Sequence, residues 1–171
     1  MTDAQQPGEC YWAVIEPFWR AVSIYDGPDK FLRQLRVLPP KAGKLFAAHW
    51  CQSEVRNGGL HQFFSNCTGV LAPEALAAFQ TIGLTEWAAI LAEAMQFFGA
   101  PYPREQTDRQ KQLSGHRGRR REEWDPFFVL DERFYSWLHA ESDRWERAAD
   151  RYTAEKDAAP GTSSESDAPV T

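Results

Sequence analysis

The sequence predicts an all-α fold: one compact helical bundle of about six to seven helices, followed by a disordered C-terminal tail. Apolar residues recur three and four positions apart along most of the 171 residues, and no useful length of chain alternates in the manner of a strand. Aromatic residues make up 13% of the chain, so a few helices can share a large aromatic core. Glycine and proline divide the periodic segments at short intervals.

The N-terminal elements are separated by prolines. Residues 1–9 are polar and expected to be flexible, and helical periodicity begins near Cys10. Pro17 should kink or break the first helix, because it lacks an N–H group. The turn before Pro28 starts a second, short helix, and Pro39-Pro40 ends it and begins the next.

The third helix is predicted to end at Asn57. Gly58 and Gly59 follow it, and glycine suits the left-handed C-terminal cap of a helix. A short helical turn and a loop then lead to a helix that opens at Pro73 and ends at Gly83. Thr85 is the expected N-cap of the helix after it.

The remainder of the chain contains a loop, a long helix and a tail. Residues 99–124 are predicted to form a mobile basic loop, with one helical turn around Gln106–Leu113. A single last helix starts near Pro126. Residues 157–171 consist mainly of Ala, Ser, Thr, Pro and acidic residues, which predicts disorder. The folded domain therefore spans residues 10–156.

Composition excludes few functions. The net charge is −5, but residues 1–156 carry only −2, so charge alone indicates no particular partner. No signal peptide or membrane span is legible, and a cytoplasmic location is expected. The three cysteines, Cys10, Cys51 and Cys67, fit no disulfide or metal frame. We therefore predict neither a metal nor a cofactor, although a Cys–His pair could still assemble in space.

A polar and aromatic motif follows the third helix. It comprises Asn57, Gly58, Gly59, His61, Gln62, Phe63, Phe64 and Asn66. We interpret these residues as a structural motif whose amides satisfy backbone groups at the helix end. The alternative is a ligand site that includes His61.

Arginines provide the strongest charge signal. Arg117, Arg119, Arg120 and Arg121 could bind phosphates or an acidic protein surface. The alternative is a solvated loop whose charge is answered by Glu122 and Glu123.

The last predicted helix carries an acidic face. Its candidate partner-binding residues are Glu141, Asp143, Glu146 and Asp150. Glu141 lies three to four residues from Trp137, Leu138 and Trp145, so we expect it on the apolar stripe with a buried or half-buried partner.

Three segments together resemble a known family. They are Glu54-Val55-x-Asn57-Gly58-Gly59-Leu60-His61-Gln62-Phe63-Phe64-x-Asn66-x-x-Gly69, its continuation Ala72-Pro73-Glu74-Ala75-Leu76, and Leu130-Asp131-x-x-Phe134-Tyr135. This pattern, over roughly residues 10–155, is similar to the bacterial family of small helical proteins typified by DNA mimic protein nineteen. The resemblance implies an all-α domain. For the protein after which the family is named, it implies an acidic surface that imitates DNA phosphates and occupies a transcription regulator's DNA-binding face.

The leading hypothesis is a non-enzymatic protein-interaction module, which could bind a DNA-binding regulator through the acidic face of the last helix. The alternative is binding of nucleic acid or a phosphorylated ligand through Arg117–Arg121. A third hypothesis, an enzyme with a pocket near His61, Gln62 and Asn66, lacks a legible nucleophile or acid/base pair.

Overall fold

The computed structural model describes residues 6–115 and 118–155. In these ranges the chain is helical and forms no strand, which confirms the all-α prediction. The elements are α1 (Glu9–Ile15), η1 (Glu16–Phe18), α2 (Pro28–Arg36), α3 (Pro40–Ser65), η2 (Cys67–Leu71), α4 (Ala72–Ile82), α5 (Thr85–Gln96), α6 (Gln106–Leu113), α7 (Arg121–Trp124), α8 (Phe128–Ala140) and α9 (Arg144–Ala154). The predicted tail, residues 157–171, lies outside the described residues, as do residues 1–5 of the predicted flexible N-terminus.

The described residues contain more α-helices than the six to seven predicted. The predicted last helix is divided into α8 and α9, because the chain leaves the helical conformation at Glu141 (φ −145°, ψ 89°). The predicted basic loop contains α6 and α7, and α6 coincides with the helical turn expected around Gln106–Leu113. Among the described helices, none is both long and apolar enough to cross a membrane.

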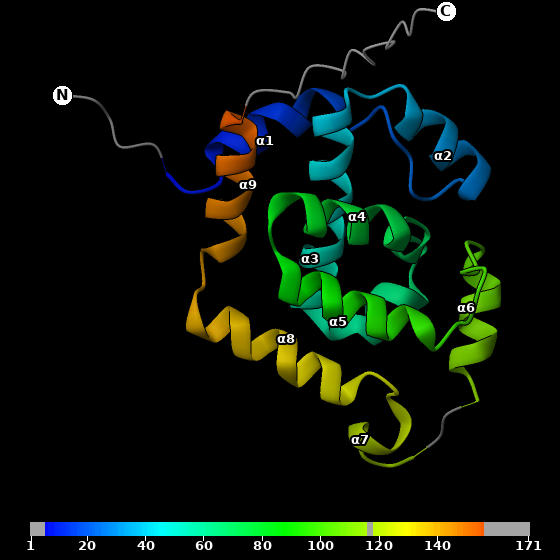
Figure 1. Cartoon of the computed structure of the whole chain (residues 1–171). Helices are drawn as coiled ribbons and strands as arrows, with labels where there is room; N and C mark the ends of the chain where they lie inside the picture. The colour runs from blue at the N-terminus through cyan, green and yellow to red at the C-terminus, as the bar shows by residue number, and fades with distance from the viewer. Residues whose placement is uncertain (1–5, 116–117, 156–171) are drawn as a thin grey trace, which may run out of the picture.

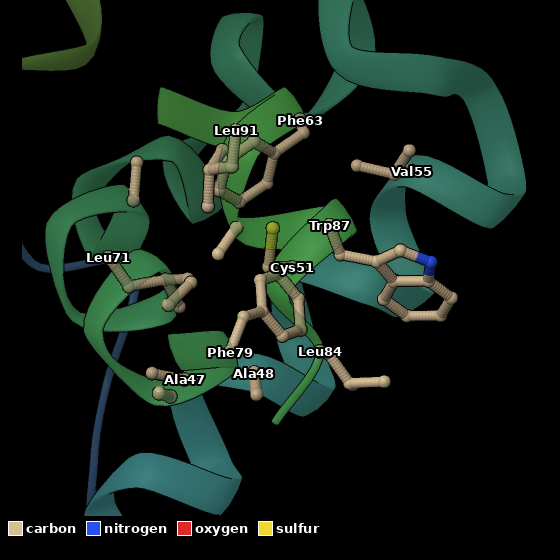
Figure 2. Close-up of a cluster of buried hydrophobic side chains, with 14 of the residues drawn as sticks. Ala47, Ala48, Cys51, Val55, Phe63, Leu71, Phe79, Leu84, Trp87 and Leu91 are labelled. Atoms are coloured by element: carbon tan, nitrogen blue, oxygen red, sulfur yellow. The ribbon is translucent and has the colours of Figure 1, made fainter. Parts of the chain in front are cut away.

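Helix α3 is the central element of the bundle. Helices α4 and η2 make the most extensive contact with it, and α1, α2, α6 and α8 also pack on it (Figure 1). Ala47, Ala48 and Cys51 are buried on α3, and these small side chains allow its neighbours to approach closely. Figure 2 shows Cys51 among the larger side chains of the core, including Phe79 and Trp87.

Several boundaries follow local sequence signals. Helix α1 ends at Ile15 and continues as the 3-10 turn η1, which contains Pro17. Helix α4 ends at Gly83, as predicted, and this glycine adopts the left-handed conformation (φ 88°, ψ 18°). Thr85 is not the N-cap of α5, because the helix already includes it; its hydroxyl donates to Glu86 instead of capping a backbone N–H.

The chain after Gly99 closes the C-terminal end of α3. Arg109 on α6 is fully buried, and its guanidinium donates to the carbonyl oxygens of Phe64 (2.8 Å) and Asn66 (2.8 Å). It also donates to the carbonyls of Pro103 and Arg104. The last carbonyls of a helix lack intrahelical partners and carry partial negative charge, so a cation there is stabilising.

Neighbouring residues support this arrangement. Ser65 O accepts bonds from Gln106 (2.9 Å) and Gln110 (2.8 Å), and the Tyr102 hydroxyl donates to Gly69 O (2.8 Å). A Cβ on Gly69 would lie 2.6 Å from Arg109 Nε, so glycine leaves the space that the guanidinium occupies. The prediction of a mobile loop is therefore replaced, for residues 102–113, by a segment that caps α3.

We predict that Arg109→Lys destabilises the fold by about 3 kcal/mol, because an ammonium group cannot reach all four carbonyls and leaves buried acceptors unpaired. Equilibrium urea unfolding, followed by circular dichroism, measures this change. Arg33→Lys on the exposed side of α2 is the control and should change stability by less than about 0.5 kcal/mol. Equal effects of the two substitutions would contradict the capping role of Arg109.

Candidate functional site

The Asn-Gly-Gly motif interrupts α3 and redirects it. Gly58 (φ −155°, ψ 15°) and Gly59 (φ 80°, ψ 179°) leave the helical conformation, and helix resumes at Leu60. The predicted interruption after Asn57 is confirmed, but the predicted left-handed cap is wrong. Gly58 has a negative φ, and Gly59 combines a positive φ with an extended ψ, a region open mainly to glycine.

A buried carboxylate holds this kink. Asp131 on α8 is 1% exposed, and its Oδ1 accepts a hydrogen bond from the Leu60 N–H (2.8 Å). Its Oδ2 pairs with Arg121 Nη2, and Arg121 Nε also donates to Asp125 Oδ2 (2.9 Å). The Tyr135 hydroxyl, one turn further along α8, donates to Val55 O (2.7 Å), just before the kink.

Burial dominates the electrostatics of Asp131. It raises the pKa of this carboxyl to about 6, although the Leu60 N–H and the Arg121 guanidinium favour the ionised form. A carboxylate is tolerated here because a backbone donor and an arginine satisfy it. The arrangement fastens α7 and α8 to the middle of α3.

Both glycines are needed for steric reasons. A Cβ on Gly59 would collide with the Asp131 carboxylate and lie 2.5 Å from Arg121 Nη2. A Cβ on Gly58 would collide with the side-chain amide of Gln62.

The amides of the motif serve a carboxylate. Glu54 Oε2 accepts bonds from Gln62 Nε2 (2.9 Å) and Asn66 Nδ2 (3.1 Å). The expectation that these side chains satisfy backbone groups is therefore wrong, although their role is still structural: the bonds cross the kink from one side to the other. Phe63 and Phe64 are fully buried in the core, whereas Asn57 is exposed. His61 packs edge-on against Trp124 of α7 (centroids 5.0 Å apart, 88°).

The predicted arginine site is largely occupied by carboxylates of the same chain. Arg121 is bound to Asp125 and Asp131, as described above. Arg120 pairs with Glu123 (2.8 Å) and Glu122 (3.2 Å), which agrees with the alternative that these glutamates answer the basic charge. Glu123 also accepts a bond from the Arg119 N–H (2.9 Å). Arg117 lies outside the described residues.

The predicted acidic face divides into exposed and structural residues. Glu141 is not on a buried stripe: the chain leaves α8 at Ala140, so its side chain stays 49% exposed and pairs with Arg147. Asp143 pairs with the same arginine (3.3 Å), and Glu146 pairs with Arg56 (3.2 Å).

Asp150 is used within the fold. Its two carboxylate oxygens accept bonds from the N–H groups of Gly8 (2.7 Å) and Tyr11 (2.9 Å), which are free donors at the start of α1. Asp150 therefore joins α9 to α1 and is a poor candidate for a partner contact.

A family model for DMP19-like proteins matches residues 36–156, which is more than half of the chain and includes both sides of the kink. The chain belongs to the DMP19-like protein family. Comparison with curated proteins and with solved structures gave no match. In this DMP19-like protein, the segments that resemble the family include the residues that build and fasten the kink in α3, Gly58, Gly59 and Asp131.

Two thiols and a partly buried histidine of this DMP19-like protein, Cys51, Cys67 and His49, are in unreactive surroundings. Burial raises the pKa of Cys51 and, less strongly, that of Cys67, which keeps both thiols protonated. Burial lowers the pKa of His49 to about 4, and its Nδ1 lies 3.2 Å from the Tyr11 hydroxyl. Within residues 6–115 and 118–155, no group of three or more His, Cys, Asp or Glu side chains could hold a metal ion.

The sequence predictions assigned no individual role to three residues that the structure makes central: Glu54, Arg109 and Asp131. A signal existed for Asp131, which is four residues after Phe127 and three before Phe134, on the buried side of α8. Arg109 carried no such signal, because its helix has only Leu113 as an apolar neighbour one turn away.

We predict that Gly59→Ala destabilises the fold by about 3 kcal/mol or more, through backbone strain and the collision with Asp131. Gly83→Ala is the matched control: Gly83 also has a positive φ, but nothing lies within 4 Å of its Cβ position. The control should cost about 1 kcal/mol. Thermal unfolding of both variants measures the difference, and equal losses would refute a steric role for Asp131.

We also predict that His49 destabilises the fold at low pH. The unfolded histidine binds a proton near its usual pKa of 6.5, but the folded one does so only near 4, so stability is lost as the pH falls between these values. Between pH 7 and pH 5 the stability of the wild type relative to His49→Gln should fall by about 2 kcal/mol.

Asp131 has the opposite effect on stability, because its raised pKa favours folding as the pH falls towards 4. The wild type and the His49→Gln variant both contain Asp131, so its effect cancels when the two proteins are compared. The control is His139→Gln at an exposed position of α8. Urea unfolding at both pH values measures the change. A pH-independent difference in stability between wild type and His49→Gln would contradict the lowered pKa of His49.

Proposed function

We propose that this protein is a non-enzymatic interaction module that binds a DNA-binding regulator through carboxylates at the junction of α8 and α9. Membership of the DMP19-like family carries this proposal. The acidic patch, defined as Glu141, Asp143 and Glu146, supplies the negative charge that a basic DNA-binding face would recognise. Asp150 is left out of the patch, because the start of α1 uses both of its oxygens.

Two carboxylates of the acidic patch are available for exchange of partners, whereas Glu146 is only 23% exposed. Glu141 and Asp143 are 49% and 42% exposed in their side chains, and their intramolecular partner Arg147 is equally open to solvent. Exposed ion pairs of this kind contribute roughly 0–1 kcal/mol each. An arginine or lysine of a partner could therefore replace Arg147 at little cost.

Two groups of residues support a role without catalysis. On α3, the histidine His49 is partly buried and the cysteine Cys51 is fully buried, and both are held in their neutral forms. The motif that would otherwise suggest a polar site, from Asn57 to Asn66, is used to shape α3 and to fasten α7 and α8.

Direct nucleic-acid binding is supported less well. Arg120 and Arg121 already pair with carboxylates, and releasing Arg121 would leave the buried Asp131 without its cationic partner. The acidic patch is the better candidate for contact with another macromolecule.

We predict that the full-length, affinity-tagged protein retains a DNA-binding protein from native lysate of its source organism. The double variant Glu141→Lys with Asp143→Lys should retain at least tenfold less of the DNA-binding protein, because two lysines would repel its basic face where two carboxylates attract it. Glu93→Lys is the matched control, since Glu93 is also an exposed, arginine-paired carboxylate (53% exposed) but lies on α5.

The operator DNA of the captured regulator should compete with the wild-type protein for it. Retention of no DNA-binding protein, or equal retention by the double variant, would count against the proposal. A parallel titration of the protein with labelled duplex DNA at low and high salt tests the arginine alternative, for which binding should weaken steeply as salt rises.

A further inference from the structure

An apolar groove with a basic rim lies between α2, α3 and α4. Its volume is about 340 Å³, and its apolar lining residues include Leu35, Leu38, Pro40 and Ala77. Val37, beside it in the chain, is 82% exposed. Apolar surface of this kind, open to water and bordered by charge, is typical of an interaction site.

The charge at the rim is positive. Arg36, in the last turn of α2, and Lys44, in the first turns of α3, line the groove together with Glu74. Glu74 is neutralised by two bonds to Arg104 (2.7 and 2.8 Å). Among the described residues, no carboxylate forms an ion pair with Arg36 or Lys44. An occupant with negative charge and apolar side chains would match this groove.

The C-terminal end of α9 lies beside the groove. Lys41 Nζ donates to the carbonyl oxygens of Thr153 (3.3 Å) and Glu155 (2.5 Å), and it lies over the Tyr152 ring (5.4 Å). Lys41 follows Pro40 directly and precedes Gly43 and Lys44 on the first turns of α3. Figure 1 shows the C-terminal end of α9 and the start of α3 at the same pole of the molecule. The chain therefore leaves its last described residue next to the groove's α3 wall.

The residues that follow have the complementary chemistry. Positions 157–171 contain Asp157, Glu165 and Asp167 and no basic residue, and their apolar side chains are those of alanine, proline and Val170. Fifteen residues can span up to about 50 Å when extended, which is ample to follow a groove that begins beside the attachment point.

We propose that the groove between α2, α3 and α4 binds this acidic segment, residues 157–171 of the same chain. The carboxylates of the segment pair with Arg36 and Lys44, and its alanines, prolines and valine cover the apolar walls. The covalent tether gives the segment an effective concentration in the millimolar range, so a weak contact is sufficient. An acidic, apolar segment of another protein would have to displace it. The inference is independent of the proposed function, which uses the α8–α9 junction.

Site-specific photo-cross-linking of the full-length chain tests this inference. p-Benzoylphenylalanine replaces Ala77, an exposed residue that lines the groove, and the matched control carries it at Ala89, exposed on α5. Mass spectrometry should locate cross-links from position 77, but not from position 89, within residues 157–171 of the same molecule.

Charge reversal separates specific docking from proximity alone. Arg36→Glu combined with Lys44→Glu should reduce the cross-link yield at least fivefold, whereas Arg33→Glu, on the same helix but outside the groove lining, should leave it within twofold. Raising the salt concentration to 0.5 M should also lower the cross-link yield of the protein that carries no charge reversal, because salt screens exposed ion pairs. The salt experiment requires no charge substitution, so it remains informative if the double variant unfolds.

Cross-links to a second copy of the chain, seen as a covalent dimer, would assign the groove to self-association and overturn the proposal. Equal yields from positions 77 and 89, or a yield that neither salt nor charge reversal changes, would also overturn it. Circular dichroism of each variant confirms that the fold is retained.

Discussion

The hydrogen bond between the Leu60 N–H and the buried Asp131 carboxylate is the interaction on which the arrangement of this protein depends. A 26-residue helix that ran straight would carry Phe63 and Phe64 away from the core they fill. The kink redirects the second part of α3, and Asp131 holds it there. A buried carboxylate requires a partner, and Arg121 supplies it by pairing with Asp131. Because α7 begins at Arg121, this ion pair also positions α7.

The end of the redirected helix creates a second requirement. The terminal carbonyls of α3 point into the protein rather than to solvent, and a buried helix end without partners is strongly unfavourable. Arg109 supplies the donors, and the segment after Gly99 is ordered around it. Two buried charges on distant helices therefore specify the path of α3, while the aromatic core supplies most of the apolar burial.

In this division of roles, the motif from Asn57 to Asn66 shapes α3. Its glycines are chosen by close contacts with Asp131 and Gln62, and its amides are bonded to Glu54. The surface is different: carboxylates on α5 and at the α8–α9 junction meet exposed arginines in pairs that solvent weakens. Such pairs can exchange partners without disturbing the kink or the capped end of α3.

The sequence alone determined what depends on neighbours along the chain. Its helical periodicity predicted an all-α domain, Pro17 predicted a break, and the glycines after Asn57 and at residue 83 predicted interruptions, since each is a property of a few consecutive residues. Tertiary structure decided the rest. The burial of Arg109, the pairing of Asp131 with Leu60 and Arg121, and the exposure of Glu141 each depend on where distant segments pack or where a helix ends in space. A local pattern cannot encode the free energy of burying a charge, because that free energy is set by a partner elsewhere in the chain.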